Sequence, residues 1–234
     1  MDDVDFIWGH KKLYNDFPTY FKKKFSERVQ KVSIDAGFTC PNRDGLKGYG
    51  GCTYCNNKTF KPTYCNLKNS ITSQIQQGVD FFSKKYKAMK FIAYFQAYTN
   101  TYAPLEDLKK LYEEALRHPK IIGLVISTRP DTVSPELLDY LAELSKKVYV
   151  MVEFGLESHL DKSLQLVNRG HSFSESVWAL EETAKRGINN CAHFILGLTG
   201  ETRNDFLEQA KVISKLPVKN LKLHQLQIHK GTVM

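Results

Sequence analysis

The sequence predicts an α/β fold, a partial (β/α)6 TIM-type barrel of parallel strands. Short apolar runs of strand length alternate along the chain with longer segments of helical period, which is the pattern of repeated βαβ units. Most of these runs are apolar at nearly every position, as in strands that are buried on both faces. A doubly wound sheet is the alternative, and in both folds the working site lies at the carboxyl ends of the strands.

The first part of the chain, residues 1–30, is expected to be an N-terminal extension with one short helix. Its aromatic residues recur at helical spacing, with three lysines between them; they are Phe17, Tyr20, Phe21 and Phe25. Aromatics interleaved with lysines can contact RNA, but packing of this helix against the domain is the favoured interpretation. Residues 31–234 are expected to form the core barrel.

The first two strands are expected at 32–36 and 91–97, on either side of a helix at 70–87. The first strand alternates apolar and polar residues, whereas the second, FIAYFQA, is an unbroken apolar run. The helix between them has one apolar face, and Ser70 is a suitable N-cap.

The middle of the chain continues the alternation. A helix is expected at 104–118, with Pro104 in its first turn. The strand GLVIST follows at 123–128. The next helix is expected at 135–146, because a proline at 135 follows a serine, the arrangement typical of a helix start.

The last strands are expected at 148–157, 189–197 and 221–228. The helices at 173–186 and 202–215 separate them. A Ser172–Glu175 capping box begins the first of these helices. The chain stops soon after the sixth strand without a closing helix, so we expect a C-terminally truncated barrel.

The most informative segment is the loop after the first strand, which contains three of the five cysteines, Cys40, Cys52 and Cys55. Eleven residues separate the first two cysteines and two residues separate the second pair. Four glycines lie in the longer gap, so the loop buries little apolar surface and needs another source of order. Three thiolates around an inorganic centre would supply it.

Two kinds of centre are compatible with this spacing. A structural zinc ion normally has four protein ligands, and the fourth would have to be Cys65 or a distant histidine. A redox-active dithiol is a further option for the close pair. Three cysteines also suit a cubane iron–sulfur cluster whose fourth iron stays open for a ligand, and the position of the loop after the first strand favours this centre.

Composition narrows the class of protein. There is no run of eighteen apolar residues and no secretory signal at the N-terminus, so we expect no membrane span. An odd number of cysteines is atypical of a disulfide framework and favours a reducing compartment, the cytoplasm. The net charge of +8 and the pI of about 9.1 are compatible with an anionic partner such as nucleic acid.

The motif DAGFTCPNRDG…GGCTYCNN resembles that of radical S-adenosylmethionine (SAM) enzymes of the YtqA/YhcC-like family, which lie near Elp3-like enzymes and oxygen-independent coproporphyrinogen oxidases. The resemblance extends over essentially the whole chain. It implies a [4Fe-4S] cluster on Cys40, Cys52 and Cys55, with the aromatic Tyr54 just before the last cysteine. The eleven-residue gap differs from the three-residue gap that is commonest in the superfamily.

The resemblance also implies which residues bind SAM. Gln96 would stand where relatives have a glycine-rich segment that meets the methionine amino group. Thr128 and Arg129 would lie at the edge of the cofactor, Glu157 on its ribose or methionine, and Arg169 on its carboxylate. The remaining candidates are His193 near the ribose and the adenine contacts Ile195 and Leu198. Glu153 is expected to be a buried, paired group or a second cofactor contact. Lys222, His224 and Gln227 on the last strand are candidates for substrate contact, but two-residue alternation puts Gln227 on the opposite face from the other two, so they cannot all point inward.

The resemblance implies reductive cleavage of SAM to a 5′-deoxyadenosyl radical that abstracts hydrogen from a substrate. The leading hypothesis for the substrate is tRNA, at the C5 side chain of a wobble uridine, trimmed from carboxymethylaminomethyl to aminomethyl. A flavodoxin- or ferredoxin-type protein would supply the electron. The alternatives are a radical SAM enzyme acting on a small porphyrin-like molecule and a zinc-stabilised RNA-binding module without catalysis.

Overall fold

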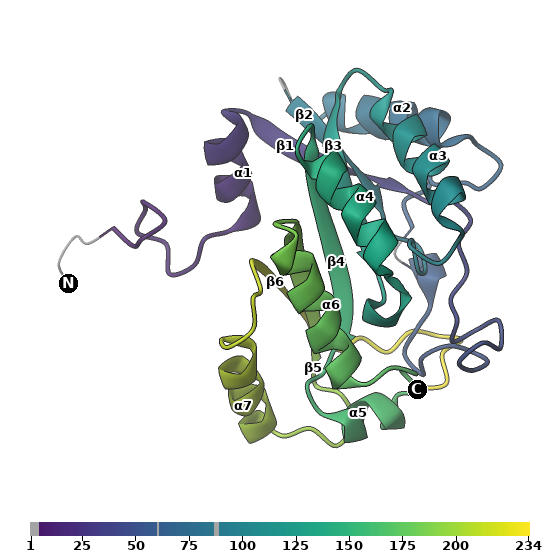
Figure 1. Cartoon of the computed structure of the whole chain (residues 1–234), viewed down its shortest axis with the longest axis vertical. Coiled ribbons are helices and arrows are strands. Elements are labelled where there is room, and N and C mark those ends of the chain that lie inside the picture. Colours follow the sequence, from purple (N-terminus) through teal and green to yellow (C-terminus); the bar gives the residue numbers. More distant parts are fainter. Residues whose placement is uncertain (1–4, 60, 87–88) are drawn as a thin grey trace.

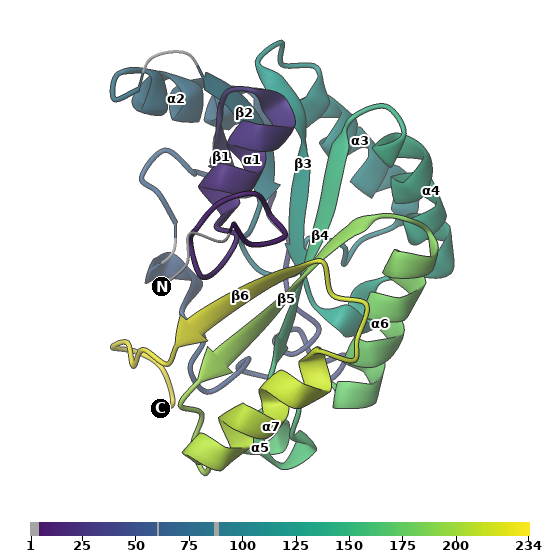
Figure 2. The ribbon, with the colours of Figure 1, turned by 90° about the vertical axis from the view of Figure 1, so that its left-hand side faces the viewer.

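The computed structural model describes residues 5–59, 61–86 and 89–234. Its centre is one sheet of six parallel strands in the order β1-β2-β3-β4-β5-β6. The strands are β1 (Arg28–Ile34), β2 (Met89–Phe95), β3 (Ile121–Thr128), β4 (Tyr149–Glu157), β5 (Asn189–Leu196) and β6 (Asn220–Gln225). Figures 1 and 2 show this sheet curled into a half-barrel, which confirms the predicted fold class.

Helices follow the strands in the expected alternation. They are α1 (Phe17–Phe25), α2 (Ile71–Ser83), α3 (Leu105–Leu116), α4 (Pro135–Ser145), α5 (Asp161–Leu166), α6 (Phe173–Lys185) and α7 (Arg203–Ile213), with short 3-10 turns at Asn57–Thr59 and Pro130–Thr132. The predicted N-caps Ser70, Ser134 and Ser172 each accept a hydrogen bond from the first turn of their helix. Helices α2, α3, α4 and α6 cover the convex face of the sheet (Figure 1).

The larger apolar core lies between the convex face of the sheet and these helices. Alternate strand residues enter it because successive side chains of a strand point to opposite faces. In β4, for example, Val150, Val152 and Phe154 are fully buried in this core. Leu138 of α4 and Leu180 of α6 pack against the same cluster.

The concave face of the sheet is covered at one end by α1. Phe21 is 2% exposed and packs edge-on against Tyr149 of β4, with ring centroids 5.4 Å apart. Residues of β2 to β5 that face away from the outer helices complete this second cluster; they are Ile92, Tyr94, Val125, Met151 and Cys191. Helix α1 therefore closes the inner side of the half-barrel, as Figure 2 shows in front of β1, and the expected packing role of its aromatics is confirmed.

Four details differ from the sequence prediction. Strand β1 begins at Arg28, so a boundary at residue 31 falls inside the strand. Helix α2 ends at Ser83, four residues early, and residue 87 lies outside the described part of the chain. The segment after β4 contains the extra helix α5, which is only six residues long. Strand β6 ends at Gln225 instead of 228; it is the last strand of the sheet, and most of its residues are exposed.

None of the helices in the described part of the chain is long and apolar enough to cross a lipid bilayer.

The aromatic packing of α1 gives the first prediction. We expect Phe21→Ala to lower the free energy of unfolding by about 3–5 kcal/mol, because a fully buried aromatic ring is lost and a cavity forms. Tyr14→Ala, at a side chain 70% exposed, is the control and should change little. Denaturant unfolding monitored by circular dichroism measures both; equal effects in the two variants would show that α1 does not belong to the core.

Candidate active site

The carboxyl ends of the strands surround a cavity of about 580 Å³. Such a volume is in the range of small-molecule and cofactor sites. All three loop cysteines and eight of the nine predicted cofactor residues line it; they are Cys40, Cys52, Cys55, Tyr54, Gln96, Thr128, Arg129, Glu157, Arg169, His193 and Ile195. Leu198 is not among the lining residues: it is 1% exposed and packs behind the wall with Val167 and Ile195.

Cationic and amide groups face the sulfur atoms of the cysteine loop. The Sγ of Cys52 lies 3.6 Å from Nη1 of Arg169 and 3.8 Å from Nδ2 of Asn42, both of which can donate to it. Arg43 donates from Nη2 to the carbonyl of Cys55 at 3.0 Å. Burial raises the pKa of the Cys55 thiol, and the Arg43 guanidinium opposes this effect. A bound metal centre would stabilise the thiolate forms further.

A network of ion pairs anchors the long segment between Cys40 and Cys52. Lys47, from the middle of that segment, lies 2.8 Å from Asp131 and 2.9 Å from Glu175 of α6. Asp131 is buried and also accepts two hydrogen bonds of 2.8 Å from Arg129. Arg129 and Lys47 outweigh the effect of burial and lower the pKa of Asp131 to about 2. The carboxylate therefore stays charged and holds the loop against the barrel.

Arg129 itself is largely committed within the protein. Its fork of N–H groups binds Asp131, and its remaining Nη1 donates to the carbonyl of Arg169 at 2.7 Å. The fork of Arg129 is thus occupied by a carboxylate of the protein itself, that of Asp131. Arg129 lines the cavity and, through its bond to the Arg169 carbonyl, positions the segment that carries Arg169.

Arg169 and Glu157 form a buried pair beside Cys52. Their closest atoms, Nη2 and Oε1, are 3.4 Å apart, and the same Nη2 donates to the carbonyl of Gly155 at 2.6 Å. Glu157 follows a register shift in β4 and has φ of +70°, a conformation that is strained for a glutamate. A Cβ on Gly155 would lie 2.6 Å from Glu157 Oε1 and 2.7 Å from Arg169 Nη2, so a larger residue there would displace the ends of both side chains. The Nε of Arg169 is buried without a hydrogen-bond partner among the described residues.

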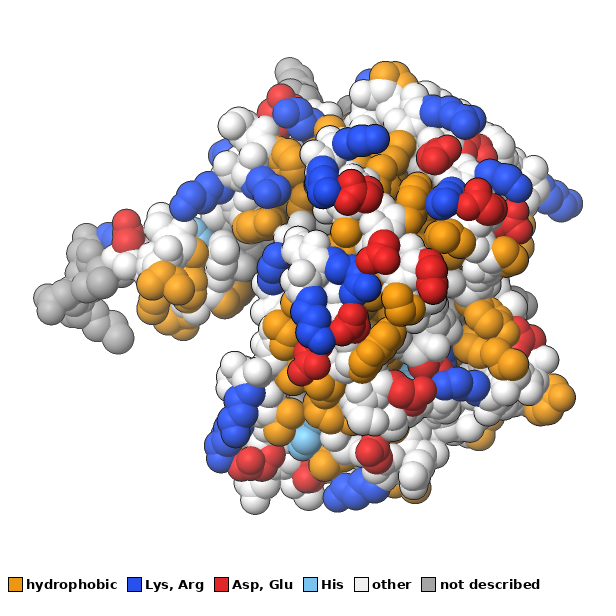
Figure 3. Space-filling view, viewed as in Figure 1, with side chains coloured by type: hydrophobic (Ala, Val, Ile, Leu, Met, Phe, Trp, Pro, Cys, Tyr) orange, Lys and Arg blue, Asp and Glu red, His pale blue; other side chains and the backbone are white. Residues whose placement is uncertain are grey.

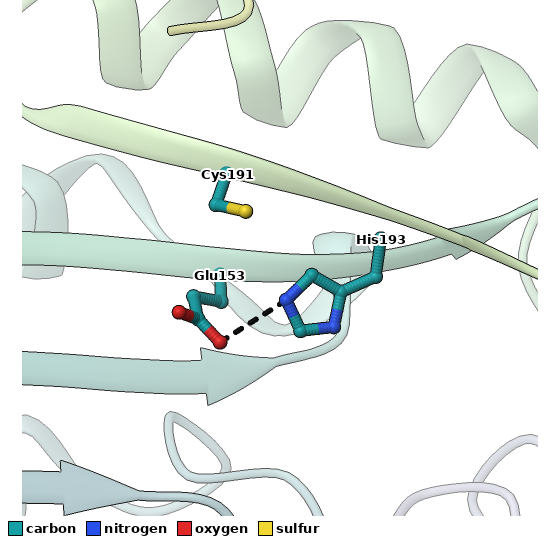
Figure 4. A group of neighbouring side chains, drawn as sticks. All are labelled: Glu153, Cys191 and His193. Atoms are coloured by element: carbon teal, nitrogen blue, oxygen red, sulfur yellow. Dashed lines mark hydrogen bonds and ion pairs between the residues drawn. The ribbon is translucent and has the colours of Figure 1, made fainter. Parts of the chain in front are cut away.

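A polar layer lies deeper in the half-barrel, below the cavity. The carboxylate of Glu153 is 1% exposed and forms an ion pair with Lys31. It also accepts hydrogen bonds from Tyr94 at 2.9 Å and from His193 at 3.1 Å. Figure 4 shows the His193 ring turned towards this carboxylate. The prediction that Glu153 is buried and paired is confirmed, and these partners hold the pKa of its carboxyl well below the usual range against the effect of burial.

Glu153, Cys191 and His193 together offer three possible metal-ligand atoms within 4.8 Å of one another (Figure 4). The surroundings oppose a divalent cation. The ammonium groups of Lys31 and Lys222 both face the same carboxylate. Burial, with Glu153 nearby, raises the pKa of Cys191 to about 12, so the thiol is protonated. The group is better described as an internal ion-pair network.

Strand β6 completes the wall of the cavity. Two-residue alternation suggested that Lys222, His224 and Gln227 cannot all face inward, yet all three line the cavity. Leu223 and Gln225, on the other face of this edge strand, line the cavity as well, and regular strand geometry ends at Gln225, so the face of a residue does not exclude it from the cavity wall. Lys222 and His224 do share one face of the strand, as the alternation predicts.

Several contacts of the site are not visible in the sequence. Asn42 and Lys47 are polar residues of the cysteine loop, Asp131 lies in the 3-10 turn after β3, and only the fold brings these parts together. His171 is 7% exposed, and its ring nitrogens lie 3.2 Å from the Gly155 carbonyl and 3.1 Å from the Ser172 carbonyl. Its position two residues after Arg169 is the only sequence cue to its role.

Comparison with known proteins identifies the class. Residues 39–213 match the model of the radical SAM superfamily, so the chain belongs to this superfamily of enzymes. It is 38% identical over 223 residues to the uncharacterised protein YtqA of Bacillus subtilis, covering 95% of this chain and 69% of YtqA. It is 37% identical over 224 residues to the protein YhcC of Escherichia coli, covering 95% of this chain and 71% of YhcC. The family suggested by the cysteine motif is therefore confirmed.

More distant matches share the fold. The chain is 27% identical over 190 residues to a tRNA-2-methylthio-N(6)-dimethylallyladenosine synthase of Thermotoga petrophila, covering 78% of this chain and 41% of the synthase. The archaeal Elp3 of Methanocaldococcus infernus superposes with a TM-score of 0.63 at 19% identity, over 88% of this chain and 47% of Elp3. Coproporphyrinogen III oxidase (HemN) of Escherichia coli has a TM-score of 0.56 at 14% identity, over 86% of this chain and 44% of HemN.

The cofactors of the superfamily are a [4Fe-4S] cluster and SAM, and the residues of this cavity fit them. The three cysteines line one wall and supply three thiolate ligands, as a cubane with one open iron requires. Beside them, the unpartnered Nε of Arg169 is a buried donor available to an anionic group. Tyr54 and Ile195 provide apolar surface for a ring.

The anchor of the cysteine loop gives the second prediction. We expect Lys47→Met to raise the rate at which a chelator removes the cluster about fivefold, because loss of a partly exposed ion pair costs about 1 kcal/mol. Asp131 keeps Arg129 as its partner, so the fold should remain. Lys110→Met, which removes an exposed ion pair on α3, is the control. Absorbance of the reconstituted protein follows cluster loss, and equal rates in both variants would contradict the anchoring role.

His171 gives the third prediction, on pH. Burial and the guanidinium groups of Arg169 and Arg129 lower the pKa of His171 to about 3, below the unfolded value of about 6.5. The neutral ring therefore contributes stability above pH about 6.5, and this contribution is lost as the pH falls towards 3. Between pH 7 and pH 5 the expected loss is about 2 kcal/mol.

Denaturant unfolding of the wild type and of His171→Gln at both pH values isolates this contribution. The variant keeps an amide near the position of Nε2 but cannot titrate. Its unfolding free energy should fall by about 2 kcal/mol less than that of the wild type over this range. Parallel pH profiles would rule out a buried neutral histidine.

Proposed function

We propose that this chain is a tRNA-modifying radical SAM enzyme that acts on the C5 side chain of a wobble uridine, converting carboxymethylaminomethyl to aminomethyl. The observation that carries the proposal is the single cavity in which the three cysteines, the Arg169–Glu157 pair and the inner residues of β6 meet. When bound, the cluster and SAM supply a 5′-deoxyadenosyl radical for hydrogen abstraction.

In this proposal the residues of the cavity bind SAM and orient it. Arg169 takes the methionine carboxylate through its free Nε, while its Nη2 stays fixed on Gly155 and Glu157 and its Nη1 faces Cys52. Glu157 and Gln96 face the polar part of the cofactor, with Thr128 and Arg129 at its edge. Ile195 and Tyr54 cover its ring, Leu198 supports Ile195 from behind, and His193 lies towards the ribose.

The proposed reaction balances without a further oxidant. The side chain loses one hydrogen atom from the carbon between nitrogen and carboxylate, then one electron and one proton. Water splits the resulting carbon–nitrogen double bond into the aminomethyl group and glyoxylate. SAM ends as methionine and 5′-deoxyadenosine, and the electron that the substrate gives up offsets the electron that starts the cleavage.

Charge supports a nucleic-acid substrate. The net charge is +8, and four cationic side chains but one carboxylate line the cavity; they are Arg43, Arg129, Arg169, Lys222 and Glu157. Figure 3 shows acidic and basic side chains interspersed over the helix-covered face, so we propose that RNA approaches the open end of the barrel. The distant Thermotoga relative is a tRNA-modifying synthase, which agrees with a tRNA substrate.

A small-molecule substrate is the second candidate, because HemN, a coproporphyrinogen III oxidase, has the same fold. The family match leaves the zinc-stabilised binding module without support. Because radical SAM enzymes need an electron donor, a flavodoxin- or ferredoxin-type protein is proposed for this role, in a reducing compartment, the cytoplasm.

The fourth prediction concerns tRNA nucleosides. Deletion of the gene should cause carboxymethylaminomethyluridine to accumulate and aminomethyluridine and its derivatives to disappear. Mass spectrometry of digested tRNA measures both nucleosides. The wild-type gene should restore the profile, and a Cys55→Ala gene, which lacks one cluster ligand, should not.

The reconstituted protein provides the direct test. With SAM, a reductant and tRNA from the deletion strain, we expect one glyoxylate for each aminomethyluridine formed. An unchanged nucleoside profile on deletion, with SAM cleavage stimulated by a porphyrinogen and not by tRNA, would establish the small-molecule alternative instead.

A further inference from the structure

The polar layer of the half-barrel contains two ammonium groups for one carboxylate. Lys31 forms the direct ion pair with Glu153, and Tyr94 and His193 complete the hydrogen bonds of that carboxylate. Lys222 is the second ammonium. Its Nζ lies 3.9 Å from Glu153, which is too long for a hydrogen bond. The charge of Glu153 is thus already balanced before Lys222 is counted.

Lys222 faces the cavity. Its side chain is 39% exposed, and it is one of the residues that line the cavity wall. His224 lies on the same face of β6, one step closer to the opening, and its ring centroid is 5.5 Å from that of His193. A lysine and a histidine therefore point into the cavity from one strand.

The electrostatic environment of Lys222 and His224 favours a bound anion. Burial lowers the pKa of Lys222, and Glu153 only partly opposes this effect. Burial, with Lys222 and His193 nearby, also lowers the pKa of His224, so its ring is neutral at pH 7 and can donate one hydrogen bond. A partly desolvated ammonium gains most when an anion pairs with it directly.

We infer that Lys222 and His224 form the recognition site for an anionic group of the substrate, a carboxylate or a phosphate. The site is separate from Arg169, which lies against Cys52 and Glu157. The inference rests on the proposed function only in taking the substrate to be RNA. A carboxylate on the modified base and a phosphate of the RNA backbone are the two sources of such a group.

Lysine acylation followed by peptide mass spectrometry tests the site without RNA. The cluster-reconstituted protein is acylated in the presence of SAM alone, and in parallel in the presence of SAM together with acetate, inorganic phosphate or acetamide. We expect acetate or phosphate to slow the labelling of Lys222 about fivefold and acetamide to have no effect. Lys120, an exposed residue just before β3 at the opposite end of the barrel, is the internal control.

Two outcomes of the labelling experiment would overturn the inference. In one, neither anion slows the labelling of Lys222 relative to Lys120. In the other, SAM alone protects Lys222 fully, which would assign the lysine to the cofactor carboxylate and not to substrate.

Matched RNA stem-loops then identify the source of the anion. One carries carboxymethylaminomethyluridine at the wobble position, and the other carries the corresponding neutral amide. We expect the wild type to bind the carboxylate form about tenfold more tightly, a difference of about 1.4 kcal/mol, and Lys222→Met to lose this preference. If Lys222→Met weakens both RNAs equally, the anion is a backbone phosphate.

Together, the acylation and RNA-binding experiments distinguish failure of the anion site from failure of the proposed tRNA function. Protection by anions without binding of either RNA would contradict the tRNA substrate and keep the anion site. Equal binding of both RNAs by the wild type and by Lys222→Met, without protection by anions, would refute the anion site and keep the tRNA substrate.

Discussion

The buried carboxylate of Glu153 is the interaction on which the inner half of the barrel depends. An open half-barrel has no hydrogen bonds between its first and last strands, so something else must hold its curvature. Glu153 on β4 binds Lys31 of β1, Tyr94 of β2 and His193 of β5. One charge thereby ties four strands across the concave face, and removal of Lys31 would leave this buried charge with only the longer contact to the ammonium of Lys222.

The same alternation of side chains that places Glu153 inside also builds the cavity above it. Two residues further along β4, Gly155 gives the space and the carbonyl that Arg169 needs. Two residues further again, Glu157 turns towards Arg169 after the bulge. The part of the cavity wall formed by Gly155, Glu157 and Arg169 therefore lies directly above the network around Glu153. The same run of polar contacts along β4 supports both the barrel and the site.

The sequence predicted most strands, helices and cluster ligands well because these features follow from local patterns. Apolar strand runs, capping serines and the three cysteines are all visible without the fold. Helix α5 was missed because six residues give no helical period to recognise. The contacts of Lys47 with Asp131 and of Lys31 with Glu153 join residues 84 and 122 positions apart, and no local pattern encodes such pairs. Leu198 was assigned to the adenine site from the family resemblance of its segment, whereas the structure buries it behind the cavity wall with Val167 and Ile195.

Three cations of the cavity look alike in the sequence, and the fold gives each a different availability. Arg129 donates its hydrogen bonds to Asp131 and to the carbonyl of Arg169. It can therefore position the segment that carries Arg169, but it has few donors left for a ligand. Arg169 keeps one free donor beside Cys52, where the cofactor belongs. Lys222 has a long contact with a carboxylate that is already paired and lies 5.8 Å from the centre of the Tyr94 ring. The capacity to bind a new anion therefore rises from Arg129 to Arg169 and Lys222. The two available cations come from different elements, Arg169 beside Cys52 and Lys222 on β6, as separate cofactor and substrate sites require.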